Sequence, residues 1–327
     1  MLGDMPSRAI VYCLLLSFLT GCASLISSRN LYVVTTPVEH LRATPGTSPQ
    51  PDTHDPDQET QLLYGEAVRL LKIQNTWAYV EAVEQSEFTH TNRWQGYPGW
   101  LPLFSLQPLQ RPPSANAVIT TKWATVWSDD QQRQRAFDLP MGTLLHVEPI
   151  EGDVVPVRLV NGGRGWIARQ EIQWLKSLRS LPPQTKRQQI VQAASRLLND
   201  PYFWGGRSPF KSESEMVTGV DCSGLVNLSY RTVGIEIPRD AHEQFLHAKR
   251  VARLQPADLI FLSDEEQPRK ITHVMLYAGD GWLIEGPGTG LAVRRIEVAQ
   301  RLGLPVEQLR PGVQVTRRTV YLGRYLP

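Results

Sequence analysis

The chain has 327 residues and a formal net charge of +2, from 34 basic and 32 acidic side chains. Hydrophobic residues make up 41% of it and aromatic residues 8%, so it can bury a core and should divide into two or three domains. This composition excludes an intrinsically disordered protein, and the scattered basic residues exclude a dedicated nucleic-acid-binding protein. No segment after residue 30 is long and apolar enough to span a membrane as a helix.

The first residues are typical of a targeting segment. Arg8 precedes an apolar stretch of 11 residues, 9–19, which is too short for a membrane-spanning helix but has the length of a signal-peptide core. The following Leu-Thr-Gly-Cys at 19–22 resembles a bacterial lipobox. The resemblance implies that residues 1–21 are cleaved and that Cys22 carries a lipid that anchors the chain to a membrane. Ala23 then favours the periplasmic face of the outer membrane in a Gram-negative cell, whereas the alternative is an ordinary cleaved signal peptide.

Two β-rich stretches follow, separated by a proline-containing connector. In both, short apolar runs alternate with Pro and Gly, which is typical of small all-β domains. The pattern of the first stretch predicts strands at 31–35, 67–73 and 77–83. The second predicts strands at 123–127, 143–147, 154–160 and 165–168. We interpret the two stretches as an imperfect internal repeat.

The first stretch resembles a bacterial SH3-like barrel of the kind attached to cell-wall peptidases. The likeness rests on Leu-Leu-Tyr-Gly-Glu at 62–66 and Gly-Tyr-Pro-Gly-Trp at 96–100, in this order. The second stretch is similar mainly through Gly-Trp-Ile at 165–167, which mirrors the Gly-Trp-Leu of the first. The resemblance implies SH3-like barrels at 31–110 and 111–179, after an anchor and linker at 22–30.

After the second linker the pattern becomes helical and then strand-like. Apolar residues at 190, 191, 194, 197 and 198 place one stripe on a helix, and a second helix is predicted to begin near Ser223. Strands are predicted at 258–262, 273–278, 282–285, 292–294 and 320–324. Helices followed by strands predict an α+β domain over 180–327.

Cys222 is the candidate nucleophile of this domain. Because Cys13 and Cys22 fall in the leader and at its cleavage site, Cys222 has no partner for a disulfide in the mature chain. A thiol attacks as thiolate, and a helix N-terminus or a nearby imidazolium lowers its pKa. Asp221 is the predicted N-cap of a helix opened by Ser223 and a glycine. These residues alone leave two readings equally open, a nucleophile and a small buried core residue.

His273 is the candidate base. It begins an apolar strand directly after a polar loop, so its imidazole can face a cleft, although an ordinary edge histidine fits the same pattern. None of the seven histidines is spaced with other ligands as in a metal site, and we expect neither metal nor cofactor.

Five segments in order resemble the NlpC family of cell-wall cysteine peptidases, which have a papain-like core. They are Pro-Tyr-Phe-Trp-Gly-Gly at 201–206, Asp-Cys-Ser-Gly at 221–224, Ile-Pro-Arg-Asp at 237–240, Pro-Ala-Asp-Leu-Ile-Phe at 256–261 and Thr-His-Val at 272–274. The resemblance covers about 190–325 and implies a papain-like fold in which Cys222 attacks and His273 acts as base. It also implies that the hydroxyl of Tyr202 and the backbone N–H of Cys222 bind the oxyanion.

Two features depart from the family pattern. The third catalytic position, where the family usually has His, Asn or Gln, falls on Glu285. A carboxylate can orient an imidazole and stabilise its cation, whereas the alternative is a surface glutamate in a domain that has lost activity. The polar segment 208–218 lengthens a loop beside the expected cleft.

The resemblance implies hydrolysis of the bond between γ-D-glutamate and a diamino acid, usually meso-diaminopimelate, in murein stem peptides. Glu66 and Tyr97 of the first barrel, with Asp221 and Ser223, are the expected substrate-binding residues. Carboxylates and an aromatic ring can hold the free amino terminus of L-alanine by charge-assisted hydrogen bonds and cation–π contact. The alternatives are a non-catalytic murein-binding lipoprotein with a degenerate peptidase domain, and a thiol acyltransferase.

Overall fold

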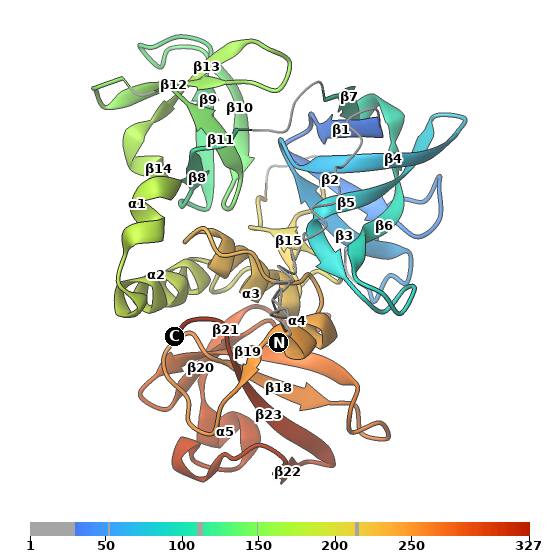
Figure 1. Ribbon diagram of the computed structural model, residues 1–327, viewed down its shortest axis with the longest axis vertical. Helices are drawn as coiled ribbons and strands as arrows, with labels where there is room; N and C mark the ends of the chain where they lie inside the picture. The colour runs from blue at the N-terminus through green and yellow to red at the C-terminus, as the bar shows by residue number, and fades with distance from the viewer. Residues whose placement is uncertain (1–29, 52, 110–113, 149, 213–215) are drawn as a thin grey trace, which may run out of the picture.

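The computed structural model describes residues 30–51, 53–109, 114–148, 150–212 and 216–327. Two small β units lie side by side, and both adjoin a C-terminal domain of helices and an antiparallel sheet (Figure 1). The predicted leader, with Cys22, lies outside the described residues, and its predictions are not tested. Among the described residues, no helix has the length and apolar character needed to cross a membrane.

The first β unit has seven strands in the order β3-β2-β6-β5-β4-β1-β7. Their bounds are Leu31–Val34 (β1), Val38–Arg42 (β2), Gln58–Leu63 (β3), Ala67–Gln74 (β4), Trp77–Glu87 (β5), Gln95–Pro102 (β6) and Leu106–Pro108 (β7), with a 3₁₀ turn at Leu103–Ser105 (η2). Alternate residues of β5, among them Ala78, Val80 and Ala82, point into the core, as the period of a strand requires.

The second β unit has seven strands in the order β10-β9-β13-β12-β11-β8-β14. Each strand corresponds to the strand numbered seven lower in the first unit, so the two units have the same strand order. Its strands are Ala117–Ile119 (β8), Trp123–Trp127 (β9), Arg135–Pro140 (β10), Leu144–Val147 (β11), Val154–Arg158 (β12), Arg164–Ala168 (β13) and Ile172–Trp174 (β14), with a 3₁₀ turn at Arg169–Glu171 (η3). The shared strand order confirms the internal repeat. The SH3-like class of the two units stays a prediction.

The C-terminal domain begins with helices, as its pattern predicts. The helices are Leu175–Ser180 (α1), Pro183–Arg196 (α2), Cys222–Arg231 (α3), Ala241–His247 (α4) and Val298–Leu302 (α5), with a 3₁₀ turn at Val306–Gln308 (η4). The strands are Arg207–Ser208 (β15), Gly219–Val220 (β16), Lys249–Arg250 (β17), Leu259–Ser263 (β18), Ile271–Gly279 (β19), Trp282–Glu285 (β20), Arg294–Glu297 (β21), Gln314–Val315 (β22) and Arg318–Arg324 (β23). The pattern did not predict α1, whose Leu175 and Leu178 pack against the second β unit.

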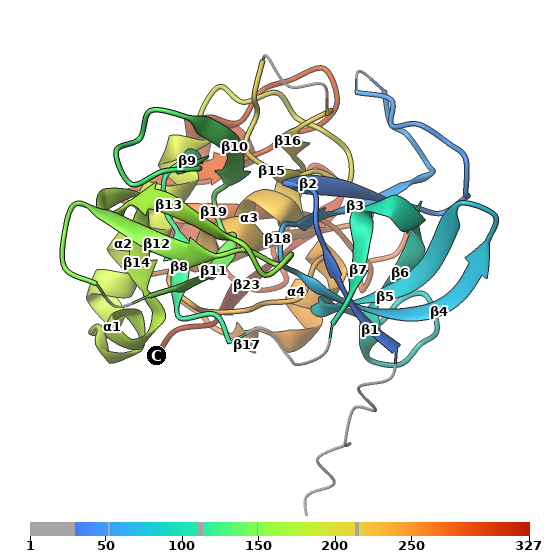
Figure 2. The same ribbon diagram turned by 90° about the horizontal axis from the view of Figure 1, so that it is seen from above.

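The main sheet of this domain is buried on both faces. Along β18, Leu259 and Phe261 pack against α2, α3 and α4, while the alternate Ile260 and Leu262 pack with α5 and the C-terminal segments. Every residue of α3 is buried, and the helix lies near the middle of the molecule (Figure 2). Both β units add side chains to the same core, so the helix that begins at the thiol is enclosed by all three parts of the chain.

Candidate active site

Cys222 is the first residue of α3. Asp221 has extended backbone angles and its side chain accepts a hydrogen bond of 2.6 Å from the backbone N–H of Gly224, which confirms the predicted N-cap. A Cβ atom on Gly224 would lie 2.1 Å from the carbonyl oxygen of Gly206, so only glycine lets that loop pass so close. The start of the helix, and with it the thiol, is therefore fixed by the loop that follows Tyr202.

His273 and Glu285 face each other across the neighbouring strands β19 and β20. The Nε2–H of His273 donates to Oε2 of Glu285 over 2.8 Å, and Glu285 is fully buried. Burial raises the pKa of Glu285, but the hydrogen bond and charge of His273 and the charge of Arg301 outweigh it and hold the pKa at about 2. Glu285 is therefore a buried, ionised partner of the histidine, and the alternative of a surface glutamate is wrong.

The thiol of Cys222 is nearly enclosed, with 8% of the residue exposed. Burial and the charge of Asp221 raise its pKa to about 12, although the backbone N–H of Val274 and the charge of Arg239 act in the opposite direction. The sequence predicted a pKa lowered by the helix N-terminus, and this expectation is wrong for the resting site because desolvation is the larger effect. The resting thiol is neutral, so attack requires a base to take its proton.

Arg239 connects the helix start to the first β unit. Its fully buried guanidinium donates to Oδ2 of Asp221 over 2.8 Å, to Oγ of Ser223 over 2.9 Å and to Oγ of Thr60 over 2.7 Å. Thr60 lies on β3, so this one cation ties the residues on both sides of Cys222 to another domain. Both carboxylate oxygens of Asp221 are thereby engaged, since Gly224 also donates to Oδ1.

Cys222 opens into a cavity of about 1090 Å³, which we call the thiol cavity. The first β unit and the C-terminal domain both line it, and the sequence-predicted residues it brings together are Tyr97, Tyr202, Asp221, Cys222 and Ser223. Burial and the charges of Cys222 and Asp221 raise the pKa of Tyr202, so its hydroxyl stays protonated and able to donate. The described residues contain no group of three or more His, Cys, Asp or Glu side chains arranged to hold a metal.

Glu66 does not line this cavity, and its predicted role in substrate binding is wrong. It is 2% exposed and accepts from Arg207 over 2.8 Å and from Gln85 over 3.0 Å, with Arg231 at 3.3 Å. These partners occupy both carboxylate oxygens. Glu66 therefore joins the first β unit to the C-terminal domain and has no free face for a substrate.

The cavity instead contains three carboxylates that the sequence did not single out, Asp240, Glu59 and Glu243. The hydroxyl of Tyr97 donates to Oδ2 of Asp240 over 2.9 Å, and Oε2 of Glu59 lies 3.4 Å from Nε2 of His90. Burial, Glu243 and Asp221 raise the pKa of Asp240 to about 7, against the lowering effect of Arg239. Hydrogen bonds to Glu59 and Glu87 raise the pKa of His90 to about 10. The signal for Asp240 was present in the Ile-Pro-Arg-Asp segment, whereas Glu59 had none.

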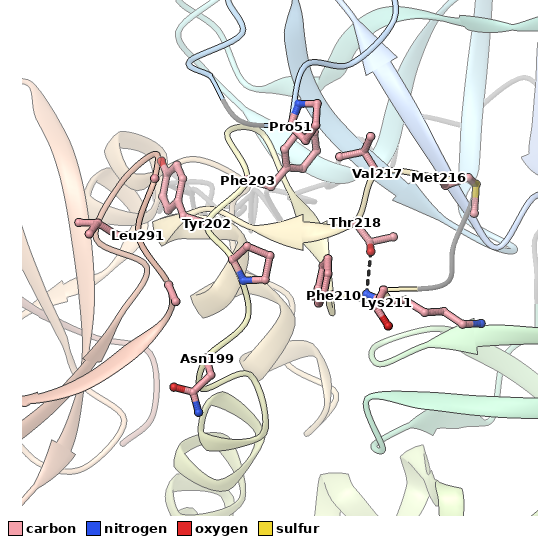
Figure 3. A pocket seen from close by; sticks show the side chains of 14 residues that line it. Pro51, Asn199, Tyr202, Phe203, Phe210, Lys211, Met216, Val217, Thr218 and Leu291 are labelled. Carbon is pink, nitrogen blue, oxygen red and sulfur yellow. Dashed lines mark hydrogen bonds between the residues drawn. The ribbon is translucent and has the colours of Figure 1, made fainter.

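A second, smaller cavity of about 520 Å³ lies on the other side of Tyr202, which lines both. Phe203, Phe210, Val217 and Leu291 form its apolar wall (Figure 3). The described parts of the polar segment 208–218 contribute to this smaller cavity and not to the thiol cavity. The longer loop thus lines a separate cavity that shares Tyr202 with the thiol cavity.

Comparisons with known proteins agree with this geometry. Residues 199–302, which hold the thiol and the His273–Glu285 pair, match the NlpC/P60 family. The chain therefore contains an NlpC/P60 domain at these residues. A γ-D-glutamyl-L-lysine dipeptidyl-peptidase of Bacillus cereus is 26% identical over 246 residues, 73% of this chain and 69% of that one. A peptidoglycan endopeptidase of Mycobacterium tuberculosis is 31% identical over 112 residues, 32% of this chain and 23% of that one.

The arrangement of the whole chain also has a counterpart among solved structures. An NlpC/P60 family protein from Bacillus cereus superposes with a TM-score of 0.73 and 22% identity, covering 91% of this chain and all of that one. This likeness concerns the fold, and it includes the two β units as well as the C-terminal domain. The family and the peptidase names of the relatives confirm the predicted enzyme class, a cysteine peptidase.

Proposed function

We propose that this NlpC/P60 peptidase hydrolyses the bond between γ-D-glutamate and a diamino acid, meso-diaminopimelate above all, in murein stem peptides. The names of the relatives support the bond and the source of the peptide. The observation that carries the proposal is the thiol of Cys222, which lines the thiol cavity and accepts a hydrogen bond from the backbone of Val274, the residue after His273 in the hydrogen-bonded His273–Glu285 pair. A nucleophile and an oriented base on adjoining elements are the parts that acyl transfer to a thiol requires.

In the first half of the proposed reaction, His273 takes the proton of Cys222 as the sulfur attacks the γ-carbonyl carbon. The backbone N–H of Cys222 and the hydroxyl of Tyr202 donate to the oxyanion, and one such donor contributes about 3 kcal/mol in other hydrolases. The carbon–nitrogen bond then breaks, and His273 returns the proton to the leaving amine of the diamino acid. A thioester on Cys222 remains.

In the second half, His273 removes a proton from water, which attacks the thioester carbonyl. The carbon–sulfur bond breaks, the thiol regains its proton and the carboxyl product leaves. Glu285 keeps Nε2 of His273 protonated in both halves, so that Nδ1 is the nitrogen that exchanges protons with sulfur and water.

The substrate amino terminus is proposed to bind at Asp240, with Tyr97 and Glu59 beside it. Oδ2 of Asp240 accepts from Tyr97 over 2.9 Å, and Oδ1 accepts only a long bond of 3.4 Å from Arg239. The Asp240 side chain is 38% exposed, so it can accept further hydrogen bonds. An ammonium group forms strong, charge-assisted hydrogen bonds with such a carboxylate. These residues belong to two domains, which gives the first β unit a part in selecting peptides with a free L-alanine amino terminus.

Three further assignments rest on sequence resemblance. The β units are proposed to be SH3-like barrels, at 31–110 and 111–179, and residues 180–327 a papain-like domain. Cys22 is proposed to carry a lipid that holds the mature chain at the periplasmic face of the outer membrane. Labelling of cells with radioactive palmitate tests the anchor: the wild-type chain should take up label and a Cys22→Ser variant should not.

The activity is tested with L-Ala-γ-D-Glu-meso-diaminopimelate and the same peptide acetylated at its amino terminus. The protein should release L-Ala-γ-D-Glu from the first peptide and cleave the second far more slowly, and a Cys222→Ala variant should cleave neither. Equal rates on the two peptides would contradict the proposed site for the amino terminus but not the proposed peptidase activity. No cleavage of either would contradict the proposed reaction.

A further inference from the structure

The carboxylate of Glu285 binds two arginines as well as the histidine. Nη2 of Arg294 donates to Oε1 over 2.7 Å, Nε of Arg301 donates to the same oxygen over 2.8 Å, and Oε2 receives the 2.8 Å bond from His273. Arg294 lies directly opposite Glu285 in the pairing of β20 with β21, and Arg301 reaches it from the last turn of α5. The proposed catalytic mechanism uses neither arginine.

The arginines change the electrostatic environment of the histidine. A single buried carboxylate stabilises the imidazolium and raises the pKa of its histidine partner. Two guanidinium groups on the same carboxylate offset its charge, so the carboxylate stabilises a neighbouring cation less than it would alone. Both are partly exposed, Arg294 by 42% and Arg301 by 24%, so solvent weakens their effect without removing it.

The arginines also fix the orientation of the carboxylate. Both arginines donate to Oε1, one from a strand and one from a helix, and Nε of Arg301 also donates to Oε2 over 3.0 Å, beside the bond from His273. Rotation of the carboxylate would break bonds to both. Oε2 is therefore held where it can accept from the imidazole in every turnover.

We propose that Arg294 and Arg301 are positioning residues that orient Glu285 toward His273 and lower the proton affinity of that histidine. The proposal builds on the proposed function only in taking His273 as the base. Titratable or charged groups bonded to the residues on either side of His273 are Cys222 on α3, which accepts from the backbone of Val274, and Arg318 of β23, which donates to Thr272. Both stay unchanged in the variants below.

The test is a pH titration of His273 in the Arg294→Gln and Arg301→Gln variants. NMR signals of the His273 imidazole report the titration in the resting protein, without substrate. Removal of a nearby positive charge favours the protonated form, so the pKa of His273 should rise by about 0.5 to 1 unit in each variant. Both limbs of the pH profile of kcat/KM should move to higher pH by a similar amount. A purely structural role would lower the unfolding temperature without moving either titration.

Arg295→Gln is the matched control, because Arg295 is the next residue of β21 and its guanidinium packs over the ring of Trp282, 4.9 Å from the centroid. It should leave the titration of His273 unchanged. Arg301→Lys keeps the charge and should shift the pKa less than Arg301→Gln. An unchanged His273 titration in both glutamine variants, or an equal shift in Arg295→Gln, would overturn the proposal. Because the NMR titration needs no cleavage, its outcome is separate from that of the proposed function.

Discussion

At the scale of single residues, Glu285 does with one carboxylate what the family usually assigns to an imidazole or an amide. Both of its oxygens are engaged, Oε1 by Arg294 and Arg301, and Oε2 by His273 and by a second, longer bond from Arg301. This division has a consequence for substitution by an amide. An amide has one accepting oxygen and one donating NH₂ group, so it cannot satisfy donors on both sides.

Glu285→Gln should therefore reduce kcat strongly. The arginines would donate to the amide oxygen, so the NH₂ group would face Nε2 of His273. Nε2 would then have to accept a hydrogen bond, which favours the tautomer protonated on Nδ1. That tautomer cannot take the thiol proton, and the comparable loss in a serine protease triad is about 10⁴-fold in kcat. Steady-state kinetics should show a fall of at least about 100-fold in kcat with little change in KM. Retention of nearly full kcat would contradict the assigned role of Glu285.

Asp240→Asn should raise KM for peptides with a free amino terminus and leave N-acetylated peptides unaffected. Loss of one charge-assisted hydrogen bond costs about 1.5 to 3 kcal/mol, which is about 10- to 100-fold in binding. In the wild type, the raised pKa of about 7 means that Asp240 is ionised above pH 7 and protonated below it. KM for the free-amine peptide should thus rise as pH falls through 7. A KM independent of pH between 6 and 8 would contradict the assignment.

The sequence could identify the reacting residues but not all of their surroundings. Cys222, His273 and Glu285 follow from ordered motifs, and the structure places the last two in direct contact. Glu66 was the wrong carboxylate because the motif that contains it does not reveal which side chains face Arg207 and Arg231 and which face the cavity. The pKa of Cys222 was also mispredicted, since the burial that raises it comes from segments distant in sequence.

At the scale of elements, the start of α3 determines where the thiol lies. The helix and its N-cap were predicted from local residues. The identity of the backbone that requires Gly224, the loop at Gly206, was not, because a close approach between segments leaves no local pattern. The same holds for α1, because its short apolar face is stabilised by packing against the second β unit and is too short to predict a helix by itself.

Gly224→Ala should destabilise the protein and reduce activity. The added Cβ would overlap the carbonyl oxygen of Gly206, so one of the two segments must shift, at a typical cost of about 1–3 kcal/mol. Alanine favours a helix interior by about 1 kcal/mol over glycine, which offsets part of this cost. Thermal unfolding should show a lower midpoint, and Gln192→Ala on the exposed side of α2 serves as the control. An unchanged midpoint with full activity would show that the helix start tolerates a side chain.

At the scale of the whole molecule, buried ion pairs join the parts of the chain. Glu66 of the first β unit pairs with Arg207 and Arg231 of the C-terminal domain, and all three are at most 3% exposed. Arg239 adds a hydrogen bond from the helix start to Thr60. The domain order and the repeat were predictable from composition and motifs. The ion pairs were not, because each joins residues more than 100 positions apart.

Glu66→Gln should therefore act on stability and not on substrate choice. It leaves Arg207 buried without a counter-charge, and breaking a buried pair in this way typically costs about 3–5 kcal/mol. The unfolding midpoint should fall clearly, whereas the ratio of kcat/KM for free and acetylated peptides should stay as in the wild type. A selective loss of the preference for free-amine peptides would instead show that Glu66 takes part in substrate binding.

The most direct measurement is mass spectrometry of the protein quenched during turnover of L-Ala-γ-D-Glu-meso-diaminopimelate. The proposed mechanism predicts an L-Ala-γ-D-Glu thioester on the peptide that contains Cys222, with more of it in a His273 variant if deacylation slows more than acylation. Cys222→Ala should show neither adduct nor cleavage. Cleavage that persists in Cys222→Ala would contradict the assignment of this thiol as the nucleophile.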